Sequence, residues 1–144
     1  MTSGPGMTEC VFCSIVAGDI PSYRVGETEQ ALAFLDISQL TPGHTLVVPK
    51  RHVPDLIDAE GALAEIATLV ESTARLLEQR LEPAGLNLLQ SSRAYAGQEV
   101  FHLHVHLVPR YRGDGGLPAL LDPGKQPVPA DELAEIQSHL VDDA

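Results

Sequence analysis

Short apolar runs separated by turn residues predict most of the strands of this chain. The run ALAFLDI (31–37) is bounded by polar residues, as expected of a buried strand. After a Thr-Pro-Gly turn, HTLVVP (44–49) predicts a second strand that ends at proline. LNLLQ (86–90) predicts a third strand, and the alternating segment 99–108 predicts a fourth.

Apolar residues that recur at three- and four-residue steps predict one long helix over residues 60–81, which ends before Pro83. Its apolar positions are Leu63, Ile66, Ala67, Val70, Ala74, Leu77 and Leu81. Residues 10–16 predict one or two helical turns. Spaced apolar residues also predict a short C-terminal helix, at Leu133, Ile136 and Leu140.

One long helix and several strands with short connections predict an α+β fold, a mostly antiparallel sheet of about five strands with helices packed against one face. Residues 1–9 predict a flexible tail, and residues 10–144 predict a single domain. Glycine and proline are frequent over residues 112–129, which predicts an irregular segment before the C-terminal helix.

Composition is that of an ordinary globular protein, with 44% hydrophobic and 20% charged residues in a chain of 144. Neither a membrane-spanning run nor a secretion signal is present in the sequence, so we expect a cytoplasmic protein without membrane contact. The formal net charge of −11 argues against a general nucleic-acid binder. A small pocket can nevertheless bind one nucleotide through backbone N–H groups.

Three histidines occupy alternate positions of the segment FHLHVHLVPR (101–110). Side chains alternate along a strand, so His102, His104 and His106 are expected to share one face. The other face, expected to be the core face, then holds Phe101, Leu103, Val105 and Leu107.

The residues alone leave three interpretations of this pattern. It is an exposed polar face, a three-histidine zinc site with a metal-bound water, or a catalytic group in which one imidazole attacks phosphorus. The pair Cys10 and Cys13 is too small for a disulfide framework. It is half of a metal site, a redox pair or two buried free cysteines.

These residues resemble the histidine-triad (HIT) nucleotide hydrolases and transferases, in particular their bacterial, zinc-containing branch. HLHVHLVP fits the family pattern His-φ-His-φ-His-φ-φ, in which φ is apolar. Further similar blocks follow in family order and spacing and cover most of residues 10–111: CVFCSIVAGDIPS, ALAFLDISQLTPGHTLVVPKRH, GLNLL and AGQEVFHLHVHLVPRY.

The resemblance implies hydrolysis of nucleoside 5′-monophosphate conjugates, such as AMP–amine phosphoramidates, through a covalent nucleotidyl-histidine. It also implies a homodimer, a purine nucleotide as ligand, and no organic cofactor. Two alternatives remain open: a dinucleoside polyphosphate hydrolase, and a nucleotide-binding or protein-interaction module whose activity is incidental.

The resemblance assigns catalytic roles to four residues. His104 is the nucleophile, and His106 contacts the phosphate. His44 is expected to reach the same phosphate, and Gln98 to hydrogen-bond near the leaving group. Gly97 would allow backbone N–H groups to approach the phosphate closely.

The resemblance also assigns the nucleoside pocket. Asp36 is expected to accept hydrogen bonds from the ribose, although an aspartate after a strand also initiates turns. The apolar slot for the base is expected to consist of Phe12, Ile15, Phe34 and Ile37.

The turn QSSRAYAGQ departs from the family, whose members often have asparagines and a glycine there. One expected asparagine contact to sugar or phosphate is therefore either missing or replaced by Ser91. Glu99 occupies a position that often carries a small hydroxyl residue. A carboxylate beside the phosphates favours a substrate with few phosphates or with a cationic leaving group.

The resemblance finally implies a structural Zn²⁺ held by two thiolates and two imidazoles. Its expected ligands are Cys10, Cys13, His52 and His102. The three histidines of the triad would then have different roles, one in the metal site and two in catalysis. His139 is expected to be a surface residue.

Overall fold

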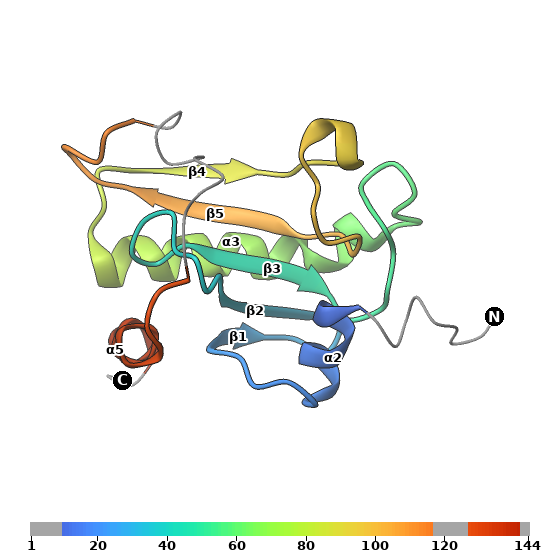
Figure 1. The fold of residues 1–144 in the computed structure, drawn as a ribbon, viewed down its shortest axis with the longest axis horizontal. Helices are drawn as coiled ribbons and strands as arrows, with labels where there is room; N and C mark the ends of the chain where they lie inside the picture. The colour runs from blue at the N-terminus through green and yellow to red at the C-terminus, as the bar shows by residue number, and fades with distance from the viewer. Residues whose placement is uncertain (1–9, 117–126, 142–144) are drawn as a thin grey trace.

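A computed structural model describes residues 10–116 and 127–141, which form a five-stranded sheet and three α-helices (Figure 1). The elements in chain order are α2 (Val11–Ala17), β1 (Arg24–Glu27), β2 (Ala31–Leu35), β3 (Thr45–Pro49), α3 (Ala62–Leu81), β4 (Gly85–Leu89), the 3₁₀ turn η1 (Ala94–Ala96), β5 (Val105–Arg110) and α5 (Ala130–Val141). The predicted tail, residues 1–9, and residues 117–126 of the predicted irregular segment lie outside the described part. Among the described helices, none is long and apolar enough to cross a membrane.

The strands follow the spatial order β1-β2-β3-β5-β4, and every neighbouring pair is antiparallel. The predicted α+β fold with a mostly antiparallel sheet is therefore confirmed. All residues of β2 and of β3 are buried, so these central strands are covered on both faces. β4 is an edge strand whose residues are exposed or half-buried.

The helices cover both faces of the sheet, so the expectation of helices against one face is wrong for α2. One core cluster joins alternate residues of β2, such as Ala31 and Ala33, to Ile66 of α3 and Leu133 of α5. A second cluster joins the intervening residues of the same strands to α2, with the members Cys10, Phe12, Ile15, Leu32, Phe34, Leu46 and Val48. In Figure 1, α3 runs behind the sheet, on the face away from the viewer.

The predicted histidine strand is wrong at its start, because β5 begins at Val105 rather than near residue 99. The pairing partner β3 ends at Pro49, and the ladder between them runs only from Thr45↔Leu107 to Val47↔Val105. Before β5 the chain instead pairs with a loop, through Leu103 N–H and the Val53 carbonyl at 2.8 Å.

Phe101, which was expected on the core face, is 51% exposed because it lies outside the sheet. Leu103, Val105 and Leu107 are buried as expected. The strand also continues to Arg110, two residues past the predicted end.

Two features of the observed fold differ from the sequence prediction. Strand β1 was missed because it has four residues, only Val25 of them buried, and an irregular register between Arg24 and Gly26. The buried face of α3 is also rotated from the predicted one, since Leu63 and Ala67 are exposed. The buried positions are Ala62, Ile66, Leu69, Thr73 and Leu77.

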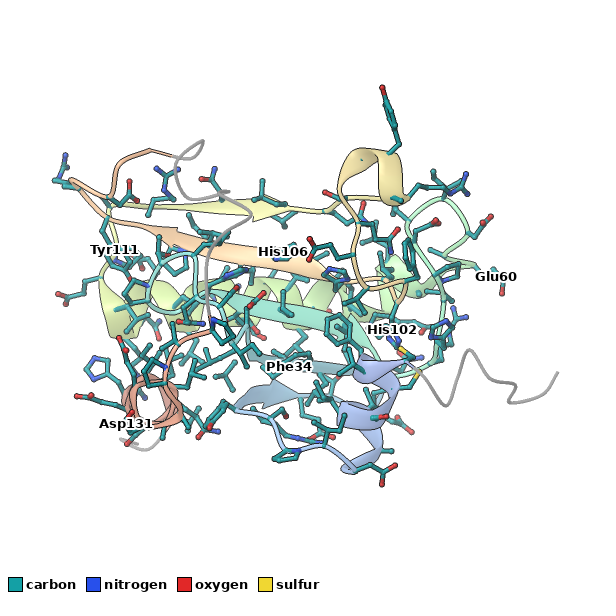
Figure 2. All side chains as sticks on the ribbon, viewed as in Figure 1. Phe34, Glu60, His102, His106, Tyr111 and Asp131 are labelled. Atoms are coloured by element: carbon teal, nitrogen blue, oxygen red, sulfur yellow. The ribbon has the colours of Figure 1, made fainter. Side chains whose placement is uncertain are left out.

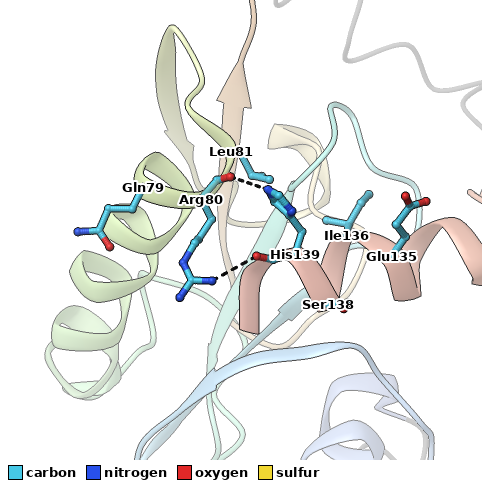
Figure 3. Close-up of a pocket in the computed structure, with 7 residues that line it drawn as sticks. All are labelled: Gln79, Arg80, Leu81, Glu135, Ile136, Ser138 and His139. Atoms are coloured by element: carbon cyan, nitrogen blue, oxygen red, sulfur yellow. Dashed lines mark hydrogen bonds between the residues drawn. The ribbon is translucent and has the colours of Figure 1, made fainter. Parts of the chain in front are cut away.

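The C-terminal ends of α3 and α5 contact each other at the surface (Figure 3). His139 Nε2 donates to the Arg80 carbonyl at 2.8 Å, and Arg80 Nη1 donates to the His139 carbonyl at 3.5 Å. His139 is exposed, as predicted.

Gly43, in the turn before β3, is a position where only glycine fits. Its φ is +97°, and an added Cβ would overlap Leu81 Cδ1 and approach Pro109 Cγ at 3.2 Å. We predict that Gly43→Ala lowers the free energy of unfolding by roughly 2–4 kcal/mol, from backbone strain plus overpacking. Urea denaturation followed by circular dichroism measures this loss.

The matched control is Gly18→Ala, since Gly18 has a similar φ of +84° with no atom within 4 Å of an added Cβ. This variant should lose only the strain contribution, about 1–2 kcal/mol. Equal losses in the two variants would show that the contact with Leu81 has no effect.

Candidate active site

The candidate catalytic residues lie on the face of the sheet that α2 partly covers. Side chains alternate along the strands, so Leu46 of β3 and its register partner His106 of β5 face the same side as Phe34. In Figure 2, His106 lies along β5 and His102 lies beside α2, near the yellow sulfur atoms. His102 and His104 keep this side although they precede the strand, since both rings contact Phe12 edge-on.

His104 is held in one tautomer by the main chain. Its Nδ1 lies 2.7 Å from the His102 carbonyl, which can only accept, so Nδ1 carries the proton and Nε2 the lone pair. Burial lowers the pKa of His104 below its ordinary value, against opposing effects of the His102 carbonyl and Asp36. The ring is therefore neutral at pH 7, with an unprotonated nitrogen that can attack an electrophile.

His44 and His106 form a second ordered pair. Leu40 N–H donates to His44 Nδ1 at 3.1 Å, which leaves the His44 proton on Nε2. That nitrogen lies 3.0 Å from His106 Nδ1, so His106 accepts there and carries its own proton on Nε2. Burial lowers the pKa of His106 to about 4, with further lowering by His44 and His104. His106 can thus donate its Nε2–H to a ligand, whereas the Nε2–H of His44 is donated to His106.

Asp36 follows β2 and is ionised. Its Oδ1 accepts from the N–H and the hydroxyl of Ser38 at 2.8 and 2.7 Å, as in a turn-initiating aspartate. Burial would raise the pKa of Asp36, but His44 and the two Ser38 hydrogen bonds leave it below its ordinary value. Oδ2 lies 3.7 Å from His44 Nε2 and keeps acceptor capacity. The turn interpretation and the ribose interpretation are therefore compatible.

Cys10, Cys13, His52 and His102 bring four metal-binding atoms within 4.8 Å of one another. Cys10 is the N-cap of α2, where its Sγ accepts from Cys13 N–H at 3.3 Å, so the start of the helix positions both thiols. His102 Nε2 lies 2.9 Å from the Pro49 carbonyl, which fixes the proton there and leaves the Nδ1 lone pair for the cluster.

The distances within this cluster match a tetrahedral metal site. His102 Nδ1 lies 3.2 Å from His52 Nδ1 and 3.4 Å from Cys10 Sγ, and Cys13 Sγ lies 3.3 Å from His52 Nδ1. Zinc–nitrogen and zinc–sulfur bonds of about 2.0 and 2.3 Å give tetrahedral edges of roughly 3.3–3.8 Å. Burial raises the pKa of Cys13 to about 12, so a cation is needed to hold its thiolate here.

A second group, Asp36, His44 and His106, also has closely spaced ligand atoms but does not suit a metal. The Leu40 N–H occupies His44 Nδ1, so His44 would have to lose its only ring proton to bind a cation through Nε2. A hydrogen-bonded pair of neutral imidazoles explains the same distances.

An apolar pocket of about 400 Å³ adjoins these residues. It is lined by all four residues predicted for the base slot, Phe12, Ile15, Phe34 and Ile37, and by Asp36 and Glu99. Leu46 and Val100 also line it and were not predicted, because their sequence signal is that of ordinary core residues. The larger hollow of about 750 Å³ between α3 and α5 (Figure 3) is more open and lies away from the triad, so it is not the candidate site.

The remaining predicted residues lie in the loop that leads to the triad and are not among those that line this pocket. Gln98 is 5% exposed, and its amide is bonded to the main chain at Arg93, Pro54 and Val100. Gly97 has a φ of +104°, and an added Cβ would lie 4.0 Å from Ser91 Oγ. The main-chain groups that fix the tautomers of the histidines were not predicted, because every residue has them and no sequence pattern distinguishes them.

The HIT domain model matches residues 17–113. A Bacillus subtilis protein named "Protein hit" is 51% identical over 108 residues, 74% of each chain. The adenosine 5′-monophosphoramidase hnt1 of Schizosaccharomyces pombe is 38% identical over 109 residues, 75% of this chain and 79% of that protein.

Among solved structures, a Zn-bound histidine triad family protein from Mycobacterium smegmatis superposes with a TM-score of 0.76 at 36% identity. The match covers 94% of this chain and 95% of that one. The likeness thus extends from the triad to the whole fold, as the sequence resemblance predicted. The chain belongs to the HIT family.

Proposed function

We propose that this protein hydrolyses nucleoside 5′-monophosphate conjugates, such as AMP–amine phosphoramidates, through a covalent intermediate on His104. The observation that carries the proposal is the buried, neutral His104, whose Nδ1–H is bound to the His102 carbonyl so that Nε2 holds the lone pair. The phosphoramidase of S. pombe, at 38% identity, supports the same class of reaction.

In the proposed reaction, His104 Nε2 attacks the α-phosphorus as the bond from phosphorus to the amine breaks. The departing nitrogen takes a proton from solvent, so a neutral amine leaves and a nucleotidyl-histidine remains; the water that attacks in the next step returns a proton to solvent. Water then attacks the same phosphorus, which releases the nucleoside monophosphate and restores His104. We assign His106 to the phosphate oxygens, as a neutral donor at Nε2 that needs no change of tautomer, and His44 to holding that tautomer through the hydrogen bond from its Nε2 to His106 Nδ1.

The pocket is proposed to hold the nucleoside. Its apolar walls suit a purine base, and Asp36 keeps acceptor capacity for ribose hydroxyls. Glu99 also lines the pocket and adds a second carboxylate. A dinucleoside polyphosphate carries more negative charge than a phosphoramidate and is therefore disfavoured.

We further propose that Cys10, Cys13, His52 and His102 hold a structural Zn²⁺. The sulfur and nitrogen donors suit this ion, and a closed set of four protein ligands leaves no position for substrate. When bound, the ion supplies cross-linking of α2 to the loops around it rather than chemistry on the phosphate.

A homodimer is proposed to form through β4. This edge strand exposes Leu86 and Leu88, at 38% and 56%, along with backbone groups on its outer side. An exposed apolar edge strand is a template for pairing with another chain. A second copy of β4 would extend the sheet across the interface.

His104→Ala should reduce the turnover of adenosine 5′-phosphoramidate by about 10³-fold or more, because it removes the nucleophile. Mass spectrometry of quenched wild-type reactions should detect an AMP adduct on a peptide containing His104, and the variant should give none. His139→Ala, at an exposed histidine, is the control and should keep full activity. Faster cleavage of diadenosine polyphosphate than of phosphoramidate would favour the other substrate class, and cleavage of neither would end the proposal.

Removal of zinc should destabilise the fold before it affects the chemistry. Metal analysis should find about one zinc ion per chain, and Cys13→Ser should lower both metal content and the melting temperature, by roughly 10 °C. Below that temperature the variant should still form the AMP adduct. A full metal complement in Cys13→Ser would remove this residue from the ligand set.

Leu88→Lys should convert the dimer into a monomer, because a charged residue on the edge strand disfavours pairing. Light scattering after gel filtration should give twice 15.4 kDa for the wild type and 15.4 kDa for the variant. Leu63→Lys, at a 44% exposed position on α3, is the control and should remain dimeric. A monomeric wild type would contradict the assignment of β4.

A further inference from the structure

Arg93 has a backbone conformation that is almost restricted to glycine. Its φ is 82° and its ψ is 153°, a combination in which the Cβ of any other residue meets the adjacent main chain. Such a conformation persists only where the surrounding contacts hold it. The contacts around Arg93 are therefore expected to matter more than those of an ordinary surface arginine.

Two ion pairs hold the side chain of Arg93. Nε lies 3.0 Å from Asp55 Oδ2, and Nη2 lies 3.1 Å from Asp58 Oδ2. The Asp55 side chain is only 6% exposed, and its Oδ1 accepts from Asp58 N–H at 2.8 Å. The main acceptor for the guanidinium is thus itself fixed in place.

Gln98 holds the backbone of the same residue from the other side. Its Oε1 accepts from Arg93 N–H, and its Nε2 donates to the carbonyls of Pro54 and Val100 at 2.7 and 3.0 Å. A further bond joins Leu56 N–H to Ser92 Oγ at 3.1 Å. The loop over residues 91–98 is therefore tied to residues 54–58 at several points.

The position of this loop matters because it leads directly into the nucleoside pocket. Glu99 and Val100, the next two residues, line the pocket beside Phe12 and Asp36. A displaced loop would move this wall while the β5 end of the triad stays in the sheet.

We propose that Arg93 is a positioning residue, whose ion pairs with Asp55 and Asp58 hold a strained loop so that Glu99 and Val100 form one wall of the nucleoside pocket. The ion pairs stabilise this conformation of the loop, whereas the backbone strain at Arg93 destabilises it. Loss of the pairs alone releases the loop, whereas glycine at position 93 removes the strain and makes the pairs unnecessary. The catalytic part of this inference rests on the proposed function, and the structural part does not.

Four variants test the proposal: Arg93→Ala, Arg93→Gly, Asp55→Asn and the double variant Arg93→Gly/Asp55→Asn. Asparagine keeps an oxygen for Asp58 N–H but removes the charge that faces Arg93. Steady-state kinetics with adenosine 5′-phosphoramidate gives kcat and KM. Amide hydrogen exchange of residues 91–99 reports the loop without substrate.

Arg93→Ala should raise KM about tenfold, since binding must then select a closed loop that is populated a tenth of the time. Its kcat should stay within about twofold, because the bound enzyme has the wild-type loop. Asp55→Asn should also raise KM, because it weakens the same ion pair. Arg93→Gly should keep KM within about threefold of the wild type. The double variant should have the same KM as Arg93→Gly. The rate of amide hydrogen exchange in residues 91–99 should rank the variants in the same order as KM.

Glu27→Ala is the control, since it breaks an exposed ion cluster with Arg24 and Lys50 at the far edge of the sheet. It should change neither KM nor the exchange of residues 91–99. The proposal fails if Arg93→Ala leaves loop exchange unchanged, or if Arg93→Gly releases the loop as much as Arg93→Ala does. If the wild type does not cleave the conjugate, the proposed function fails, and the exchange data still decide whether the ion pairs hold the loop.

Discussion

The hydrogen bond from His104 Nδ1 to the His102 carbonyl is the interaction on which the rest of the site depends. It gives the second histidine of the triad a fixed tautomer and a fixed orientation at a distance of 2.7 Å. The same residue that provides this carbonyl has a ring fixed by the Pro49 carbonyl, with its other nitrogen in the Cys10, Cys13 and His52 cluster. His102 thus connects the two sites. Its ring lies in the proposed metal site, and its main-chain carbonyl holds the proposed nucleophile, His104.

This connection explains how the three histidines of the triad, which are chemically identical side chains at alternate positions, can have different properties. None of the three rings differs from the others in covalent structure. They differ in which nitrogen is protonated, and the main chain decides this through Pro49 for His102, through His102 for His104 and, by way of His44, through Leu40 for His106. Burial lowers the pKa of all three, so that each is neutral and its tautomer is well defined.

The sequence pattern predicted the parts of the molecule that depend on side-chain periodicity. Alternation correctly placed the three histidines on one side of the chain, even though only His106 lies in the strand. The pattern could not show where a ladder ends, so β5 was started too early, and Phe101 was wrongly placed in the core. It missed β1, whose single buried residue leaves no period to detect. The backbone conformation of Arg93 could not be predicted from the sequence either, since an arginine predicts an ordinary backbone. Only its contacts with Asp55, Asp58 and Gln98 explain the observed conformation.

Charge limits which phosphates such a site accepts. The chain has a formal net charge of −11, and among its described residues those that line the proposed nucleoside pocket include two carboxylates and neither lysine nor arginine. Among the described residues, the group that we assign to the phosphate is the neutral N–H donor of His106, which binds over a short distance and does not compensate several negative charges. Each additional phosphate would add repulsion from Asp36 and Glu99 without adding a cationic partner. This arrangement of charges therefore supports the proposed substrate class, a conjugate with a single phosphate, in which a cationic amine as leaving group would be attracted by the carboxylate of Glu99.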